Sequence, residues 1–155
     1  MSRATVAPAP PSPPAAATRA NLGFLLAKAS QRWNELLYER FVRAGYPDVR
    51  PSYGSLLVPL FEQDGLRMGE LARRARLSKQ TMTTMVRLLE RDGLVSRETD
   101  ATDARATRIY LTPRAREFRP VAEEVLGDLD ALVDANLGAR RARAAAAFLV
   151  DLIEL

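Results

Sequence analysis

The stretch that decides the fold is residues 67–112, RMGELARRARLSKQTMTTMVRLLERDGLVSRETDATDARATRIYLT. Within it, Ser78 is a good helix N-cap, and four apolar residues follow at a spacing that places them on one buried stripe of a helix. These residues are Met82, Met85, Val86 and Leu89. Because Asp92-Gly93 closes the segment, the pattern predicts a helix over residues 78–92 whose other face is polar.

A shorter helix precedes this one, and a hairpin follows it. Apolar residues from Met68 to Ala75 recur at helical spacing after the turn at Asp64-Gly65. Residues 94–97 and 107–111 are extended in character and flank the polar loop 98–106, which predicts a β-hairpin with a flexible tip. Two short helices around a turn, followed by a hairpin, are the elements of a winged helix-turn-helix, here expected over residues 51–112 with a further helix from Pro51 or Ser52 to Phe61.

Long amphipathic helices are predicted on both sides of this lobe, over residues 21–44, 113–136 and 139–155. The expected fold class is therefore mainly α with a small two-stranded β-wing, in one domain spanning residues 19–155. The segments 21–50 and 113–155 carry more apolar surface than a small winged domain needs, so we expect them to form a homodimer. A bundle within one chain is the alternative.

Composition excludes several classes of function. The chain of 155 residues contains no cysteine and no histidine, which removes thiolate zinc sites, cysteine nucleophiles and most general-base arrangements. We therefore expect no enzyme, no cofactor and no metal, and a reducing cytoplasm suits the chain. No apolar run is long enough to span a membrane. Residues 1–18 are rich in Ala and Pro and predict a disordered tail rather than a secretory signal.

The positive charge is concentrated in the winged segment. Residues 67–108 carry ten basic and six acidic side chains, and this excess equals the net charge of +4 of the whole chain. A basic segment that coincides with a helix-turn-helix predicts double-stranded DNA as the partner.

Individual DNA contacts follow from the side chains on the polar face of helix 78–92. Gln80 suits adenine, Thr83 or Thr84 a thymine methyl or a phosphate, and Arg87 guanine or the backbone. In the wing, Arg105 is the candidate for the minor groove, and Asp103 is expected to hold Arg105 or Arg97. The full predicted set is Ser78, Lys79, Gln80, Thr81, Thr83, Thr84, Arg87, Arg97, Asp103, Arg105 and Arg108. The alternative is an ordinary solvated helix face and loop.

Several local motifs accompany this order of elements, namely Leu71-Ala72, Leu77-Ser78, Met85-Val86, Leu89-Glu90, Gly93-Leu94-Val95 with Arg97, Asp103-Ala104-Arg105 and Leu111-Thr112. Together, the order of elements and these motifs resemble the MarR (multiple antibiotic resistance regulator) family. The resemblance implies the same pairing of Asp103 with an arginine. It also implies a crevice for a small aromatic or anionic effector between the long helices and the lobe, here lined by Arg32, Trp33, Leu37, Arg40, Tyr53, Leu57 and Phe118. These residues could equally be plain core.

The sequence thus predicts a homodimeric, sequence-specific transcriptional regulator, a repressor that reads a palindromic operator and is released by an effector. The alternatives are an architectural protein that binds DNA without sequence preference and a ligand-binding dimer without a DNA function.

Overall fold

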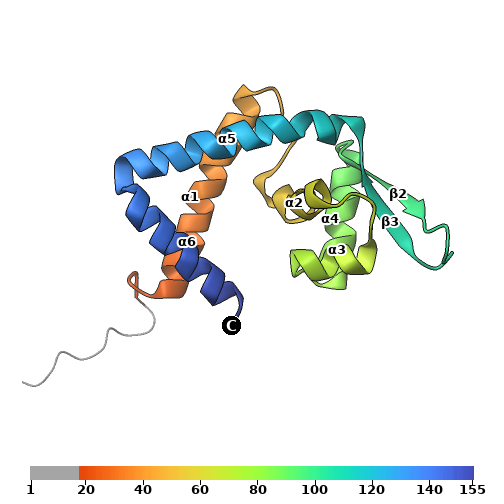
Figure 1. Cartoon of the computed structure of the whole chain (residues 1–155), viewed down its shortest axis with the longest axis horizontal. Coiled ribbons are helices and arrows are strands. Elements are labelled where there is room, and N and C mark those ends of the chain that lie inside the picture. Colours follow the sequence, from red (N-terminus) through yellow and green to blue (C-terminus); the bar gives the residue numbers. More distant parts are fainter. Residues whose placement is uncertain (1–17) are drawn as a thin grey trace, which may run out of the picture. The chain divides into compact units, whose positions relative to one another are not determined.

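The computed structural model describes residues 18–155 (Figure 1), so nearly all of the predicted tail lies outside the described residues. The described chain divides into two compact units, one ending at Trp33 and one spanning Asn34–Leu155. The first unit holds the N-terminal part of helix α1 (Leu22–Arg43). Asn21 starts this helix, because its Oδ1 accepts hydrogen bonds from the backbone N–H groups of Gly23 and Phe24 at 2.9 and 3.4 Å.

The second unit contains the remaining elements and confirms the predicted mainly α architecture. They are η1 (Pro51–Tyr53), α2 (Gly54–Glu62), β1 (Leu66–Arg67), α3 (Met68–Ala75), α4 (Lys79–Arg91), β2 (Val95–Thr99), β3 (Thr107–Leu111), α5 (Pro113–Leu137) and α6 (Ala139–Ile153). The segment predicted as one helix from Pro51 begins as a 3-10 turn and continues as α2 past Pro59.

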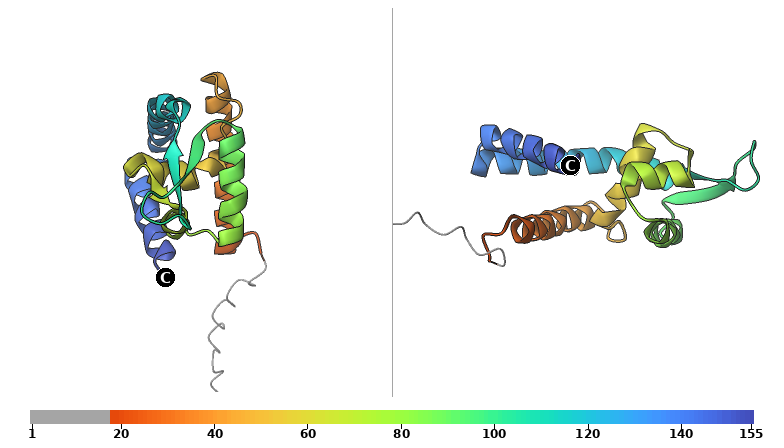
Figure 2. Two further views of the ribbon diagram at one scale, coloured as in Figure 1. Left: turned by 90° about the vertical axis from the view of Figure 1, so that its right-hand side faces the viewer. Right: turned by 90° about the horizontal axis from the view of Figure 1, so that it is seen from below.

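The sheet has one strand more than the sequence predicts. The wing strands β2 and β3 pair antiparallel, from Val95 opposite Leu111 to Thr99 opposite Thr107 (Figure 2). The two-residue strand β1 pairs with the other edge of β3, with Leu66 opposite Ile109, which gives the order β1-β3-β2. A strand this short has no alternation that a sequence pattern could reveal. It matters because it anchors the wing to the start of α3.

Hydroxyl side chains cap the N-terminal ends of α4 and α5. Ser78 Oγ accepts a hydrogen bond from Thr81 N at 3.2 Å at the start of α4, as predicted. Thr112 Oγ1 accepts from Ala115 N at 3.2 Å at the start of α5 and donates to the carbonyl of Gly93 at 2.6 Å. The second bond ties the start of α5 to the turn that ends α4.

The core of the lobe lies where α2, α3, α4 and the sheet meet. Met82, Val86 and Leu89 of α4 are at most 1% exposed, and Leu71 and Ile109 are fully buried. Burying each such side chain contributes about 1.5–3 kcal/mol. Helix α6, in contrast, buries none of its residues within the chain.

Gly65 offers a direct test of the link between β1 and the wing. Its φ of +70° is in the left-handed region, and a Cβ at this position would lie 2.7 Å from Cε1 of Tyr110. We therefore expect Gly65→Ala to lower the free energy of unfolding by about 1–3 kcal/mol in urea titrations. Gly69→Ala is the matched control, because nothing lies within 4 Å of its Cβ position. Equal stability of the two variants would contradict a close contact between Gly65 and Tyr110 of the wing.

Candidate nucleic-acid interface

The polar face of α4 presents free donors to solvent. Lys79, Gln80 and Arg87 are exposed, and within residues 18–155 their side chains have no hydrogen-bond or ion-pair partner. A helix of 13 residues is about 20 Å long, which is enough to lie in a major groove. The structure therefore brings these three predicted contacts together on one accessible surface.

The smaller hydroxyl residues of α4 use their polar groups within the helix. Thr83 and Thr84 donate to the carbonyls of Lys79 and Gln80 at 3.0 and 3.2 Å. Ser78 Oγ donates to Thr81 Oγ1 at 2.9 Å as part of the helix cap. Since these hydroxyls already donate within the helix or its cap, they can take part in further hydrogen bonds only as acceptors.

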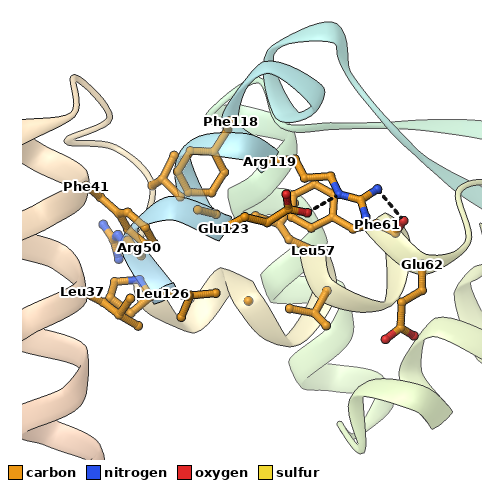
Figure 3. A pocket seen from close by; sticks show the side chains of 15 residues that line it. Leu37, Phe41, Arg50, Leu57, Phe61, Glu62, Phe118, Arg119, Glu123 and Leu126 are labelled. Carbon is orange, nitrogen blue, oxygen red and sulfur yellow. Dashed lines mark hydrogen bonds and ion pairs between the residues drawn. The ribbon is translucent and has the colours of Figure 1, made fainter. Parts of the chain in front are cut away.

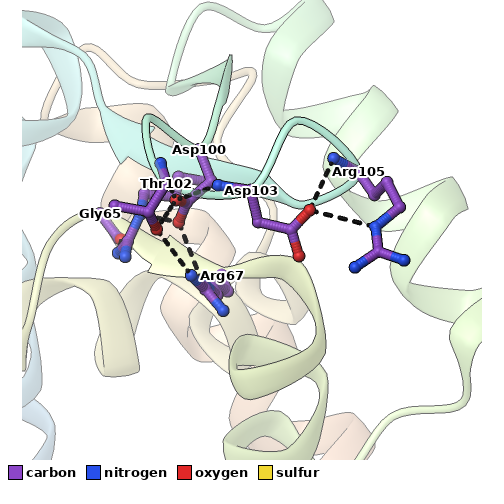
Figure 4. A network of polar contacts seen from close by, with 7 residues as sticks. Gly65, Arg67, Asp100, Thr102, Asp103 and Arg105 are labelled. Carbon is purple, nitrogen blue, oxygen red and sulfur yellow. Dashed lines mark hydrogen bonds and ion pairs between the residues drawn. The ribbon is translucent and has the colours of Figure 1, made fainter.

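The wing carries one highly exposed arginine near its tip. The side chain of Arg105 is 92% exposed, and Asp103 Oδ1 accepts from Arg105 N and Nε at 3.0 and 3.2 Å (Figure 4). The structure thus pairs Asp103 with Arg105, one of its two predicted partners. Arg97, the other, pairs with Glu90 at 2.9 Å.

Arg108 has an internal role that the sequence did not reveal. Its Nε donates to Asp100 Oδ2 at 2.6 Å and its Nη1 to the carbonyl of Gly65 at 2.7 Å. Asp100 was also missed as a site residue, although Asp side chains often accept a hydrogen bond from the backbone two residues on, as Asp100 does from Thr102 N. The predicted DNA contact by Arg108 therefore competes with two bonds at the base of the wing.

A basic groove separates the wing from α3 and α4. Arg67, Lys79 and Arg105 contribute its positive charges, and Met68 and Met82 form apolar wall. Glu70 also lines the groove, but hydrogen bonds from Arg73 and Arg74 hold the pKa of this carboxyl at about 2. Because two arginines accompany this one carboxylate, the groove remains suited to an anionic backbone.

A second polar network holds the C-terminal end of α4. Tyr53 is fully buried, and its hydroxyl donates to Asp92 Oδ2 at 2.5 Å. Arg114 of α5 donates to both carboxylate oxygens of Asp48 at 2.5 and 2.7 Å and to the carbonyl of Asp92. The hydrogen bond from Arg114 lowers the pKa of Asp48, and the hydrogen bond from Arg91 lowers that of Asp92. Tyr53 is thus part of the support of α4 rather than a wall of the predicted effector crevice.

A largely apolar cavity of about 300 Å³ lies between α2, α5 and the C-terminal end of α1 (Figure 3). Leu37, Leu57 and Phe118, all predicted for an effector site, line it together with Phe41 and Phe61. Arg50 and Arg119, rather than the predicted Arg40, supply its positive charges. The guanidinium of Arg40 donates instead to the carbonyl of Leu36. Arg32 and Trp33 belong to the N-terminal unit.

Neither a metal centre nor a membrane helix is found in the described part of the chain. Within residues 18–155, no three acidic side chains gather as they would around a metal ion. No helix there has the length and apolar character needed to cross a bilayer.

The sequence of this segment is similar to the sequences of known proteins. The sequence profile of the MarR family matches residues 51–107. Over these residues the winged-helix segment is therefore similar to the MarR family. The HTH-type transcriptional repressor Rv2887 of Mycobacterium tuberculosis is 38% identical over 84 residues, which are 54% of this chain and 60% of the relative. The HTH-type transcriptional regulator TtmR of Methylorubrum extorquens is 33% identical over 92 residues, 59% of this chain and 47% of the relative.

Solved structures confirm the MarR-type winged-helix fold. The M. tuberculosis regulator MOSR, solved in complex with DNA, has a TM-score of 0.68 and 26% identity and is covered over 96% of its chain and 86% of this one. A probable transcriptional regulator from Pseudomonas aeruginosa has a TM-score of 0.75 and 23% identity, with 97% and 86% covered. The chain spans about half to 60% of the length of these curated relatives, which are named as transcriptional regulators.

The network at the end of α4 predicts a pH-dependent stability of the winged-helix lobe. Asp48→Asn should lower the free energy of unfolding at pH 7 by about 1 kcal/mol, because a charge-assisted pair on the protein surface is lost. Since the folded-state pKa of Asp48 lies below 3.8, this contribution is present above that pH and is lost as the pH falls further. Chemical unfolding of both proteins between pH 3 and pH 7 measures the gap. Glu117→Gln, an exposed change on the helix of Arg114, is the control, and a gap that widens on acidification contradicts the assignment.

Proposed function

We propose that the chain is a homodimeric transcriptional repressor that binds a palindromic operator in double-stranded DNA. The observation that carries the proposal is the free donor face of α4 beside the exposed Arg105 of the wing. In this arrangement α4 enters the major groove and the wing approaches the neighbouring minor groove. The relatives named as repressors and the DNA complex of MOSR support it.

Each part of the interface has its own task in this proposal. Gln80 and Arg87 contact base edges, Lys79 contacts phosphates, and Arg105 enters a narrow minor groove, where the negative potential is strongest. Two copies related by a two-fold axis double these contacts, which explains why the operator is expected to be palindromic.

The first test is a binding titration with DNA from the region upstream of the gene. Unrelated DNA of equal length serves as competitor. A repressor should prefer its operator by roughly 10³-fold or more, whereas an architectural protein would bind both equally and lose both with added salt. No binding to either DNA at low salt would leave the ligand-binding dimer as the better explanation.

Substitutions separate the roles of the wing and the helix. Arg105→Ala is expected to weaken operator binding by about 1–3 kcal/mol, because the loss of its minor-groove contact is not compensated. Gln80→Ala should mainly relax the preference at one base pair, as measured with a panel of singly substituted operators. Arg43→Ala, which removes an exposed arginine of α1, is the control for charge alone. Unchanged affinity of the Arg105 variant would remove the wing from the mechanism.

The homodimer is supported by the apolar surface of the long helices. Phe148, Leu149, Val150 and Ile153 of α6 are between 40% and 59% exposed in the single chain, and Leu132 of α5 is 40% exposed. An exposed apolar surface of this kind is typical of an oligomer interface.

We expect sedimentation equilibrium to give twice the 17.1 kDa of one chain at micromolar concentration. Phe148→Asp should shift the mass toward that of the monomer, because it places a charge on the apolar face of α6. Val58→Asp makes the same kind of change at a site on α2 that is 51% exposed, and should leave the mass unchanged. A wild-type mass of one chain contradicts the dimer and favours a bundle within the chain.

The apolar cavity supports release by a small effector. A volume of about 300 Å³ suits a compact aromatic molecule, and Arg50 is the lining arginine suited to an anionic group, because Arg119 is paired with Glu123. The cavity is also connected to α4. Its lining residues Val49 and Arg50 follow Asp48 in the sequence, and Arg114 bonds both Asp48 and the carbonyl of Asp92 at the end of α4. Small aromatic carboxylates are therefore the first compounds to add to the operator titration.

A further inference from the structure

Asp100 is the one charged residue of the described chain that is buried, with a side chain that is 1% exposed. It lies at the end of β2, where the chain leaves the wing strand and enters the tip loop. A buried carboxylate is unfavourable unless it is fully hydrogen-bonded and neutralised. The hydrogen-bond donors around Asp100 therefore indicate its role in the structure.

Both oxygens of this carboxylate have several donors (Figure 4). Oδ1 accepts from Thr102 N at 2.8 Å, Thr102 Oγ1 at 2.6 Å and Asp103 N at 3.2 Å. Oδ2 accepts from Arg67 Nε at 2.9 Å and Arg108 Nε at 2.6 Å. One oxygen thus folds the tip loop, and the other fixes that loop to β1 and β3. Hydrogen bonds from Thr102 and from the two arginines hold the pKa of Asp100 far below its ordinary value, so the carboxylate stays charged.

A series of hydrogen bonds connects Asp100 to the exposed Arg105. Asp100 binds the backbone N–H of Asp103, and the carboxylate of Asp103 in turn binds the backbone and the guanidinium of Arg105. Two backbone bonds close the loop, from Asp100 N to Ala106 O at 2.9 Å and from Ala106 N to Asp103 O at 3.0 Å. Arg105 is 92% exposed, and Asp103 is its one side-chain partner among the described residues, so its direction depends on this chain of contacts.

We propose that Asp100 is a positioning residue for DNA binding: it holds the tip of the wing in the conformation that directs Arg105 toward the DNA. The inference rests on the proposed function, because it assumes that the wing contacts DNA. A loop that is ordered before binding loses less conformational entropy when the complex forms. Asp100 contributes to affinity in this way without touching the nucleic acid.

The proposal can be tested by whether neutralising the carboxylate of Asp100 strengthens or weakens DNA binding. A carboxylate that is merely near DNA repels phosphates, so its neutralisation should strengthen binding. Glu98 is such a group, because it lies exposed on the same strand, two residues from Asp100. Asp100→Asn removes the same charge from the same wing, but its amide NH2 cannot accept the bonds that Arg67 and Arg108 donate. Glu98→Gln should therefore tighten binding slightly, and Asp100→Asn should weaken it.

The experiment measures the affinity of the full-length chain for the native upstream DNA duplex at fixed salt. We expect Asp100→Asn to weaken binding about 10-fold and Glu98→Gln to leave it equal or tighter. In an Arg105→Ala background, Asp100→Asn should have little further effect, because both changes remove the same contact. Amide hydrogen exchange without DNA should rise at residues 100–106 and stay unchanged in α4.

Thr102→Val is the second variant, since it removes one donor to Asp100 at an exposed position and leaves the charge unchanged. It should weaken binding by a smaller factor, and it decides the question alone if Asp100→Asn does not fold. Binding equal to or tighter than wild type in the folded variants overturns the proposal. So does a full, additive loss in the Arg105→Ala background. If wild-type protein does not bind the duplex at all, the proposed function fails instead, and the exchange data still report on the role of Asp100 in the loop.

Discussion

The burial of one face of α4 is the constraint on which the rest of the interface depends. Met82, Val86 and Leu89 are packed into the core, and successive residues of a helix point about 100° apart. Because this stripe is buried, Gln80 and Arg87 on the opposite side of the helix face solvent. Apolar packing thus determines which polar groups of α4 are exposed, although none of the packed residues takes part in the proposed DNA contacts.

The second principle of the structure is that acidic residues of the winged segment orient arginines. Asp103 pairs with Arg105, Glu90 with Arg97, and Asp100 with two arginines at the base of the wing. A carboxylate in a basic segment would otherwise weaken the attraction for phosphate. By pairing, it instead reduces the freedom of a long side chain whose charge the interface needs.

The wing and the C-terminal end of α4 are held by two different sets of contacts, and the ion pair of Arg97 with Glu90 joins the wing directly to α4. Strand β3 lies between β1 and β2, so the wing is fixed to the start of α3 on one side. The end of α4 is fixed through Asp92, which connects to Tyr53 and, through Arg114, to Asp48. The cavity of α2 and α5 borders this second network through Val49 and Arg50. The cavity therefore lies beside the residues whose contacts hold the C-terminal end of α4.

The sequence by itself determined the helices, their caps at Ser78 and Thr112, the wing hairpin and the solvent-facing residues of α4. These features depend on interactions between residues a few positions apart, which a periodic pattern or a capping residue makes visible. It did not reveal β1, the internal role of Arg108 or the buried Asp100, and it placed Tyr53 in a crevice wall. Each of these depends on segments that are distant along the chain, such as Gly65 with Arg108 and Tyr53 with Asp92. Only the tertiary structure decided them, because local sequence does not specify which donor a buried carboxylate will meet.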